Sequence, residues 1–564
     1  MDFYGNEDGK LEFDFIVNPG IDPEQIEIQF NEIDSSYIDK NGNLSLSIDQ
    51  NELIFEKPII YQYINHSKEE ITGEYLADNT GNVKFSLGKY DPQYALVIDP
   101  VISYASYFGG GGHERIGGIA LDKDNNIYIT GQTNSADFPT TRPEIGPAEN
   151  DDMFVTKIAP DGQSILYSTV IGGKYGEFGY DIKVDGKGNA YVCGWSSSYD
   201  DLNTTEVNEG FPILNGFRDF LVDNYSSDAI AIKLNDDGSL AYSTYFGAPD
   251  EDEATALDID STGCMYIIGT TLSSIGYPGF PIRNAFQPDR GGYDYEGFVT
   301  KIDPTKVGDA SLIYSSFLGG TGDDVLNGIT VDKDGHAIVV GRVWGVNFPL
   351  VNAMYSTKKG DYDAFVTKVS PFGNELIFST FIGGDGTDTG YLVDTDENSS
   401  IYVTASVSEN FPRTEGTIGS DCTLGQVIFK MSPTGQTLEY SSFLCPIYAS
   451  AFRIDSDGSL FLLISEWKQK SDGTFGSVYS TAKLNTTATE ITQKSEIVGT
   501  IFPQVSTLDE SGNVYFGIST READLELVNP IQDVLKGWSD LYIGWTKPGE
   551  KLLIYDQVVT PAEL

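Results

Sequence analysis

One short phrase recurs along most of the chain, and it constrains the fold more than any other feature. It is a run of β-favouring residues that begins with Tyr or Phe, continues through Ser or Thr, and usually ends at glycine. Copies begin at Tyr104, Tyr167, Tyr242, Tyr314 and Phe378; a sixth, without glycine, begins at Tyr440; weaker copies stand near Val498 and Tyr555. Successive copies are roughly 60 to 75 residues apart. This long period predicts a repeat architecture with seven intervals.

Each interval repeats the same order of segments. In the first, an apolar segment ends at Asp122, a tight turn follows, and a second apolar segment ends at Gly131. A longer loop then carries Phe138, a third segment ends at Lys157, and another turn leads back to the phrase. Four short segments joined by turns predict four antiparallel strands. We therefore predict an all-β fold in which residues 101–564 form a seven-bladed β-propeller of four-stranded blades.

Eight copies of the phrase exceed the seven outer-strand places that seven blades offer. Residues 552–558 follow the third segment of the last interval through the turn at Pro548 and Gly549. We therefore expect residues 552–558 to complete the seventh blade. Residues 101–108 are then expected to form a strap between the propeller and the preceding domain.

Residues 1–100 do not carry the repeat. They contain short runs of alternating apolar and polar residues, such as 11–15 and 44–48, separated by turn signals such as Lys-Asn-Gly-Asn at 40–43. This pattern predicts about six strands in a small β-sandwich-like domain.

The strongly acidic composition excludes some partners. The 564 residues include 84 Asp and Glu against 35 Lys and Arg, a formal net charge of −49. Such a surface repels nucleic-acid phosphates and anionic membranes. The chain also contains no run of about 20 apolar residues, the length that a helix needs to span a bilayer. We expect no nucleic-acid partner and no membrane insertion. The first 20 residues are acidic and lack an apolar segment, so they do not read as a signal peptide.

The repeated motifs resemble those of a known family. They are Tyr-Ser-Thr ending at Gly-Gly, Asp-x-Asp-Gly-Asn before an apolar strand, Phe-Pro, and Asp-Ala-Phe-Val-Thr-Lys. This set resembles the SBBP β-propeller repeat proteins of bacteria over residues 101–558. Residues 4–100 are similar to the β-domain that precedes the repeat in many members, through Pro-Gly-x-Asp-Pro at 19–23 and Leu-Val-Ile-Asp-Pro at 96–100. The resemblance implies an exported or cell-surface protein whose export signal is absent from this sequence, and it implies no particular chemistry.

A carboxylate recurs eight residues before the Asp that ends the first segment of five successive intervals. These five residues are Glu114, Glu177, Asp252, Asp324 and Asp388. The loop that holds each one leads into the innermost strand, so the five side chains are expected near one mouth of the central channel. Converging carboxylates favour a hard cation, so Ca²⁺ is the candidate cofactor. The alternative is that each carboxylate caps backbone N–H groups of its own loop.

The turns after the first segment give a second set of candidate Ca²⁺ ligands. The turns at 122–126, 332–335 and 455–458 are rich in Asp, Asn and Gly and resemble the start of a calcium-binding loop. They lack the distal Glu of an EF-hand, and a tight hairpin turn uses the same residue types without metal.

Aromatic residues gather in the two longest loops, 195–227 and 270–295, where exposed rings would suit sugar rings. The candidate ligand-binding residues are Trp195, Tyr199, Phe211, Tyr225, Tyr277, Tyr293 and Tyr295. The alternative for Phe211 and for Phe280 is that each Phe-Pro pair anchors its loop to the blade.

A lysine recurs in the third segment of six intervals. These are Lys157, Lys233, Lys301, Lys368, Lys430 and Lys483, and Trp545 takes the place in the seventh. In a chain with few lysines, this regularity predicts a structural ion pair within or between blades.

Two of the four cysteines are predicted to pair. Cys422 and Cys445 flank a hairpin whose turn is at 432–435, which places them nearly opposite each other and close to disulfide range. Cys193 and Cys264 lie in apolar segments and are expected to be buried thiols.

The function expected from these features is that of a non-enzymatic, monomeric binding or adhesion module at the cell surface or outside the cell. It would recognise a polysaccharide or a surface protein through loops on one face of the propeller. The alternative is a carbohydrate-active enzyme, a hydrolase or lyase, that uses the channel-mouth carboxylates.

Overall fold

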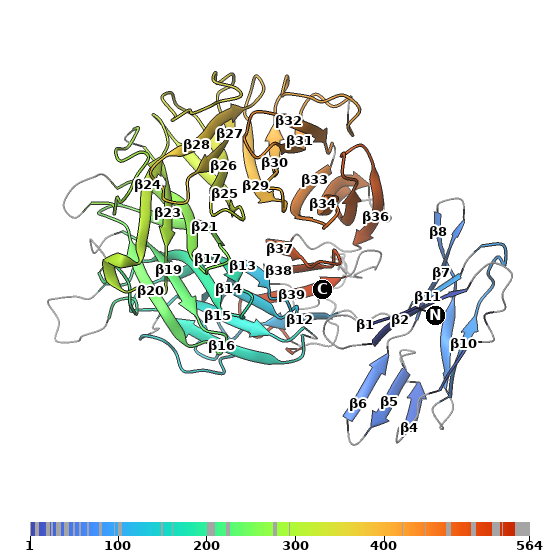
Figure 1. Ribbon diagram of the computed structural model, residues 1–564. Coiled ribbons are helices and arrows are strands. Elements are labelled where there is room, and N and C mark those ends of the chain that lie inside the picture. Colours follow the sequence, from blue (N-terminus) through green and yellow to red (C-terminus); the bar gives the residue numbers. More distant parts are fainter. Residues whose placement is uncertain are drawn as a thin grey trace, which may run out of the picture. The chain divides into compact units, whose positions relative to one another are not determined.

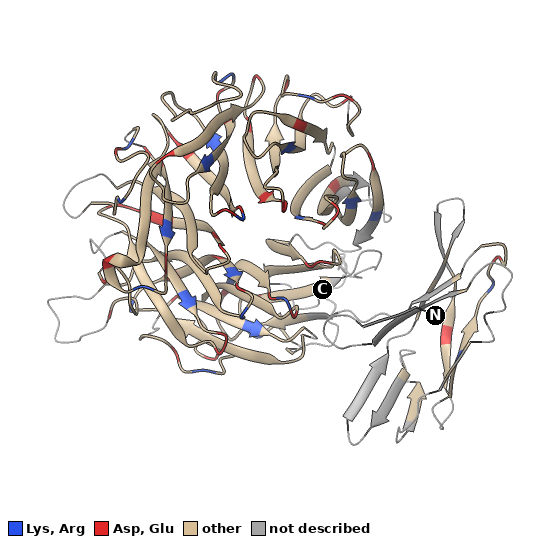
Figure 2. Ribbon diagram, in the orientation of Figure 1, with Lys and Arg blue, Asp and Glu red and all other residues tan. Residues whose placement is uncertain are grey.

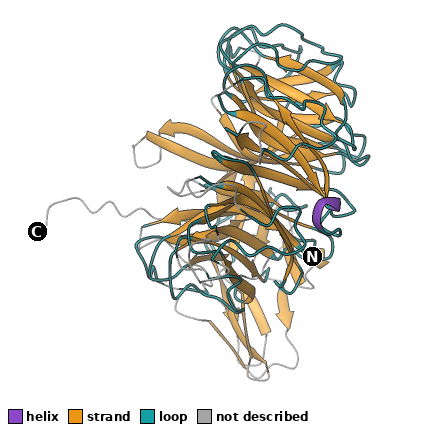
Figure 3. Cartoon of the chain, turned by 90° about the vertical axis from the view of Figure 1, so that its left-hand side faces the viewer, coloured by secondary structure: helices purple, strands orange, loops and turns teal. Residues whose placement is uncertain are grey.

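The computed structural model divides the chain into two compact units, Met1–Ser103 and Tyr104–Leu564. The structure describes residues 2–546 except for 6–10, 18–22, 24–25, 30–34, 39–43, 49–50, 56–57, 65–66, 78–81, 95, 100–103, 148–149, 161, 200–208, 221–225, 274–278, 293, 420, 446, 470–474, 498–502, 522–530 and 533. Both units are built from strands (Figure 3). The 3₁₀ turn η2 (Gly308–Ala310) is the purple segment in that figure.

The first unit consists of three small antiparallel sheets. One sheet has the order β1 (Asp2–Gly5), β2 (Leu11–Val17), β11 (Leu96–Asp99), β7 (Ile59–Ile64) and β8 (Ser67–Glu70); the second is β3 (Glu27–Gln29), β10 (Asn82–Leu87) and β9 (Gly73–Ala77); the third is β4 (Ser35–Ile38), β5 (Leu44–Ile48) and β6 (Asn51–Phe55). Each sheet contributes to one core, through side chains such as Ile60, Val83 and Leu44. The described strands outnumber the six or so expected, because several are too short to show alternation in the sequence.

The second unit is a seven-bladed β-propeller (Figure 1). The blades, each given from first to fourth strand, are: blade 1, β13 (Glu114–Leu121), β14 (Ile127–Thr133), β15 (Asp152–Ile158), β16 (Ile165–Ile171); blade 2, β17 (Glu177–Val184), β18 (Ala190–Ser196), β19 (Asp228–Leu234), β20 (Leu240–Phe246); blade 3, β21 (Asp252–Ile259), β22 (Met265–Thr271), β23 (Glu296–Ile302), β24 (Leu312–Leu318); blade 4, β25 (Asp324–Val331), β26 (Ala337–Val343), β27 (Asp363–Val369), β28 (Leu376–Ile382); blade 5, β29 (Thr389–Thr395), β30 (Ile401–Val407), β31 (Gly425–Met431), β32 (Leu438–Phe443); blade 6, β33 (Ile447–Ile454), β34 (Leu460–Gln469), β35 (Phe475–Leu484), β36 (Ile491–Ile497); blade 7, β37 (Val505–Leu508), β38 (Val514–Thr520), β39 (Asp540–Thr546), β12 (Tyr104–Phe108).

The seventh blade is completed by the first copy of the phrase. β12 pairs antiparallel with β39, and Tyr107 lies opposite Tyr542 in the register. The expectation that β12 forms a strap outside the ring is therefore wrong. β12 takes this place because it closes the ring. A strand from the start of the propeller joins three strands from its end, so hydrogen bonds tie the two ends of the ring together. Residues 552–558, which were expected in this place, lie outside the described residues.

Neighbouring blades pack face to face, so the middle strands of a blade are buried on both sides. All seven residues of β15 are buried, for example. The core clusters span adjacent blades: Val155 of blade 1 and Ile232 of blade 2 belong to one cluster. This packing explains why the second and third strands read as nearly continuous apolar runs rather than as alternating ones.

The strand order gives the propeller two distinct faces. The loops from second to third strand and from one blade to the next lie at the edge where each first strand begins; we call this edge the long-loop face. The turns from first to second and from third to fourth strand lie at the opposite edge, the short-turn face. This division decides which side chains can act together.

Candidate functional site

The five recurring carboxylates are buried at the start of the innermost strands. All five have no exposed surface. Glu114 accepts hydrogen bonds from the hydroxyls of Thr133 (2.7 Å) and Ser135 (2.5 Å) of its own blade. The backbone N–H at the glycine turn donates to the same set, as Gly173 does to Glu177 at 3.0 Å. Each side chain therefore turns back into its blade and caps its own loop, which is the arrangement that the alternative described.

Each of the five faces a second acid that the sequence reading did not single out as a partner. This acid begins the third strand of the preceding blade. The pairs are Glu114 with Asp540, Glu177 with Asp152, Asp252 with Asp228, Asp324 with Glu296, and Asp388 with Asp363. The pattern was available in the sequence, since both acids stand at fixed positions of the repeat. Burial keeps the pKa of Glu114 above its usual value, and the charge of Asp540 adds to this.

Five of the six recurring lysines form the predicted ion pair, each with the Asp that follows the first strand of its own blade, and Lys157 also pairs with Asp236 of the next blade. The sixth, Lys233, lies over the ring of Tyr191. Lys368 Nζ lies 2.7 Å from Oδ2 of Asp332, the Asp that follows the first strand of the same blade. Lys301 lies over the ring of Tyr266 in the second strand, 4.4 Å from its centre. In the seventh blade Trp545 replaces the lysine and stacks on Tyr515. Figure 2 shows lysine and arginine positions on the strands of the blades.

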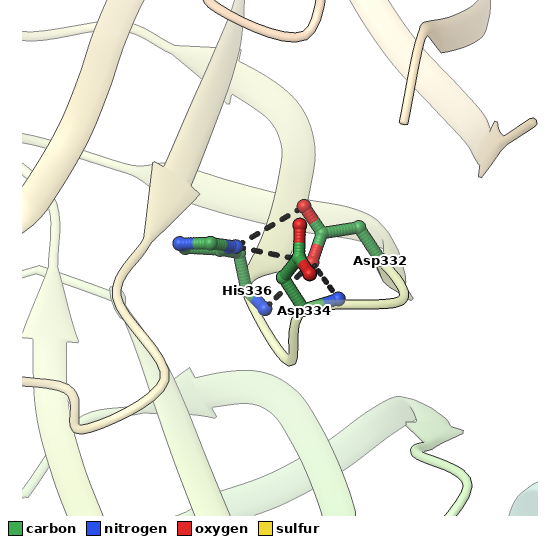
Figure 4. Close-up of side chains that lie close together, drawn as sticks. All are labelled: Asp332, Asp334 and His336. Atoms are coloured by element: carbon green, nitrogen blue, oxygen red, sulfur yellow. Dashed lines mark hydrogen bonds and ion pairs between the residues drawn. The ribbon is translucent and has the colours of Figure 1, made fainter. Parts of the chain in front are cut away.

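The first-to-second-strand turns are held by internal contacts. In Figure 4, Asp332, Asp334 and His336 lie close together, and they are the one group in the described residues with metal-ligand spacing. The backbone N–H groups of Asp334 (3.0 Å) and His336 (2.9 Å) donate to Asp332 Oδ1, and Lys368 binds Oδ2. The ammonium group of Lys368 therefore balances the charge of the Asp332 carboxylate at this turn.

Two tyrosines form a stacked pair on the long-loop face. The rings of Tyr175 and Tyr199 are 5.0 Å apart and nearly parallel, and their hydroxyl oxygens are 3.2 Å apart. Trp195 stands half-buried at the end of β18. Tyr295 is 40% exposed on the next blade, where its hydroxyl donates to Glu251.

The structure removes Phe211 from the candidate ligand-binding residues. It is 4% exposed, packs edge-to-face on Tyr245, and its backbone N–H donates to the Tyr245 hydroxyl oxygen at 2.9 Å. The alternative that Phe-Pro anchors the loop holds for Phe211 and for Phe280, which is equally buried. Tyr225, Tyr277 and Tyr293 lie outside the described residues.

Two exposed aromatic groups on the same face were missed. Trp344, 51% exposed, follows β26 and lies 6.5 Å from the ring of Tyr362, over which Arg342 packs at 4.9 Å. Trp538, which precedes β39, lies 6.0 Å from His113. Both lie in shorter loops, and the candidate residues were chosen only from the two longest loops. The sequence signal that could have found them is the rarity of Trp, with five residues in the chain.

The two hairpin cysteines form a disulfide in the structure. The Cα atoms of Cys422 and Cys445 are 6.5 Å apart. Cys445 stands where the other copies of the phrase have their first glycine. Cys193 is a buried thiol as expected, and Cys264 is half-buried.

In the described part of the chain, no helical segment has the length and apolarity that a membrane crossing requires.

Among the candidate sites, the aromatic groups of the long-loop face are exposed to solvent, while the recurring carboxylates and lysines are internal.

Comparisons with known proteins agree with this architecture. A family model described as "Domain of unknown function (DUF7948)" matches residues 1–101, and one described as "Beta-propeller repeat" (SBBP) matches residues 104–139. No curated protein matches the chain.

Several solved structures are similar at low sequence identity. BamB from Moraxella catarrhalis is 9% identical, with 93% of this chain and 98% of that chain covered and a TM-score of 0.34. The Pan2 WD40 domain from Neurospora crassa is 10% identical, with coverages of 78% and 90% and a TM-score of 0.36. An acylaminoacyl peptidase is 8% identical, with coverages of 77% and 52% and a TM-score of 0.39. These structures differ in role, and likeness at this level does not bear on function. The chain thus carries the SBBP repeat in a seven-bladed β-propeller, preceded by a DUF7948 domain.

Proposed function

We propose that the propeller is a non-enzymatic module, exported or on the cell surface, that binds a polysaccharide through exposed aromatic side chains of its long-loop face. The observation that supports this most is the stacked, solvent-accessible pair Tyr175 and Tyr199. Tyr295 and the Trp344–Tyr362 group stand on the same face of the two following blades. Aromatic rings on a rigid scaffold offer flat apolar surfaces with polar edges, which suit the faces and hydroxyls of sugar rings.

The charge of the chain narrows the class of polysaccharide. With a net charge of −49, the protein repels polyanions at moderate ionic strength. Carboxylates also flank the rings, as Glu251 does at Tyr295. The proposed ligand is therefore a neutral polysaccharide, bound by a monomer.

The enzymatic alternative depended on carboxylates at the channel mouth. Because those side chains are buried in pairs beneath the glycine turns, the described residues offer no observation that favours hydrolase or lyase activity.

The test is binding of soluble neutral α- and β-glucans, with polygalacturonate as an anionic comparison. Tyr175→Ala and Trp344→Ala should each weaken glucan binding about tenfold, which corresponds to about 1.4 kcal/mol. The matched control is Phe372→Ala, because Phe372 is 71% exposed but lies in a turn between β27 and β28 on the short-turn face. Release of sugar products, equal loss in the control, capture of a surface protein instead, or preference for the polyanion would each contradict the proposal.

A further inference from the structure

Five of the seven interfaces between blades contain a buried pair of acids. The first glycine of each turn separates the two carboxyls: a Cβ placed on Gly172 or on its counterparts would lie no more than 3.0 Å from each acid of the pair. Every strand-one acid is fully buried, and the partner acids Asp152, Glu296 and Asp363 are at most 2% exposed. The glycine is therefore required at this point because a larger residue would meet both carboxyls.

The two acids of a pair are present together or absent together. At the interface between blades 5 and 6, Gly425 stands where the other blades have the acid that begins the third strand. Ile447 stands where they have the acid that begins the first strand. The glycine is replaced there by Cys445, whose Cβ lies 3.4 Å from the place of a Gly425 Cβ. Between blades 6 and 7, Val478 and Ile501 take the two places. This joint presence indicates that the acids of a pair share one role.

The surroundings of each pair supply hydrogen-bond donors, which suit carboxyl groups and disfavour a metal ion. Asp363 accepts from the backbone N–H groups of Lys359 (2.9 Å) and Gly360 (2.8 Å). Asp540 accepts from the N–H of Lys536 and from the amide of Gln532. Two full negative charges buried side by side repel each other, and one proton shared between them removes the repulsion.

The pair Asp152 and Glu177 gives the clearest argument for a shared proton. Oδ1 of Asp152 accepts no hydrogen bond from a donor among the described residues. Burial, and then the neighbouring Glu177, raise the pKa of Asp152; burial likewise raises the pKa of Glu177. A Cβ placed on Gly172 would overlap Asp152 Oδ1 and would lie 2.6 Å from Glu177 Oε2, so these two oxygens face each other across the glycine. Two carboxylates cannot donate hydrogen bonds to each other, so a bond across this gap would need one of the two acids to be protonated.

The same direction holds at two further pairs. Burial raises the pKa of Asp252 to about 7, and burial together with the charge of Asp324 raises that of Glu296 to about 7. The pKa of Asp324 rises to about 6, mainly through burial.

Other charged groups near the pairs are few. Arg218 lies near Asp228 and Asp252, and Arg290 lies near Glu296. Near Asp324 stand Lys358 and Asp323; near Asp152 stands Glu144. For Glu114 and Asp388 the paired acid is the charged neighbour that acts on each. The cations lower the affinity for the proton at two interfaces.

We propose that each acid pair holds one proton and acts as a pH-sensitive contact between neighbouring blades, tight in acidic surroundings and loosened when the proton leaves. Above the pKa of the pair, both acids are charged and repel each other across the interface. Since the folded chain binds these protons more tightly than the unfolded chain, stability falls as the pH rises from the ordinary carboxyl range through the raised values.

The experiment is thermal unfolding of the full chain between about pH 5 and pH 9. The melting temperature of the wild type should fall by several degrees over this range. The variant Asp152→Asn/Asp252→Asn/Asp324→Asn keeps a donor in three pairs at every pH, so its curve should be flatter and should lie above the wild type at the alkaline end. Asp124→Asn, in an exposed turn, is the matched control and should follow the wild type. Parallel curves for the triple variant and the wild type would overturn the proposal.

A second measurement needs only the wild type and therefore does not depend on the folding of the variant. The infrared band of protonated carboxyl groups should persist at about pH 6, where exposed Asp and Glu have lost their protons, and should disappear by about pH 9. Absence of this band at the lower pH would overturn the proposal. Stabilisation by Ca²⁺ at the alkaline end, reversed by a chelator, would also overturn it, because a cation and not a proton would then hold the pairs.

Discussion

At the residue scale, the first glycine of the repeated turn is the position where packing allows least change. Gly172→Ala should destabilise the protein by about 1–3 kcal/mol, because its Cβ would overlap Asp152 and Glu177. The matched control is Gly186→Ala, since a Cβ there meets nothing within 4 Å. Chemical denaturation measures both. An equal effect of the two substitutions would show that the glycine is needed for its backbone and not for space between the acids.

The lysine–aspartate pair gives a prediction with the opposite pH dependence. Burial alone would raise the pKa of Asp332, but the hydrogen bond from Lys368 and the N–H of His336 hold it below its usual value. The pair therefore stabilises the fold above the ordinary Asp pKa of about 3.9, and this stabilisation is lost as the pH falls.

Lys368→Met should cost about 3–5 kcal/mol at neutral pH, because it leaves a buried carboxylate without its cation. The loss should shrink in acid, as Asp332 becomes protonated. Lys123→Met is the control; its pair with Asp124 is largely exposed, and its removal should change stability by less than about 0.5 kcal/mol. A loss for Lys368→Met that does not vary between neutral and acidic pH would contradict the assignment.

Sequence reasoning at this scale succeeded where spacing determines geometry. The turn at 432–435 fixes the register of its hairpin, so the pairing of Cys422 with Cys445 followed from counting. It left two alternatives open where the direction of a side chain decides. The sequence could not choose between a capping and a ligand-binding role for Glu177, or between a buried and an exposed Phe211, because both depend on how neighbouring strands pack.

At the scale of elements, blade 5 has a covalent cross-link. The disulfide joins the segment before its third strand to the segment after its fourth strand. The disulfide closes a loop with a sequence separation of 23 residues, and it stands at an interface that lacks an acid pair. Reduction should lower stability by about 3 kcal/mol in the chain-entropy model. The measurement is the melting temperature with and without a reductant; Cys422→Ser should melt like the reduced wild type and should not respond to the reductant. An unchanged melting temperature on reduction would contradict a stabilising role.

The four strands of each blade could be predicted because tight turns, a period of roughly 60 to 75 residues and apolar runs all agreed. The strands of the first unit were undercounted for a physical reason. β3 and β4 contain three and four residues, and such short strands owe their pairing to neighbours that sequence periodicity cannot show.

At the scale of the whole molecule, ring closure distinguishes two strands with similar sequences. Tyr107 of β12 is buried against Tyr542, so Tyr107→Ala should cost about 3–5 kcal/mol. Tyr555→Ala is the matched variant, because Tyr555 belongs to the copy that was expected in the same place. With β12 in the ring, Tyr555→Ala should leave the melting temperature unchanged. A large loss for Tyr555→Ala and a small one for Tyr107→Ala would contradict this closure.

The number of blades followed from the sequence, but the choice of closing strand did not. Copies at Tyr104 and near Tyr555 both offered a β-favouring strand next to the last interval, and chain continuity favoured the second. The structure uses the first, because a strand from the opposite end of the propeller ties the ring together. Such a preference is a property of the closed ring and not of any local segment.

The proposed function is tested most directly by hydrogen exchange of the full chain with and without a bound neutral glucan. The long-loop face should gain protection at residues 172–177, 196–199 and 342–362, which carry the Tyr175–Tyr199 and Trp344–Tyr362 groups. The turns at 122–126 and 370–375 on the short-turn face should exchange at unchanged rates. Protection confined to those turns, or to residues 1–103, would contradict the assignment of binding to the long-loop face.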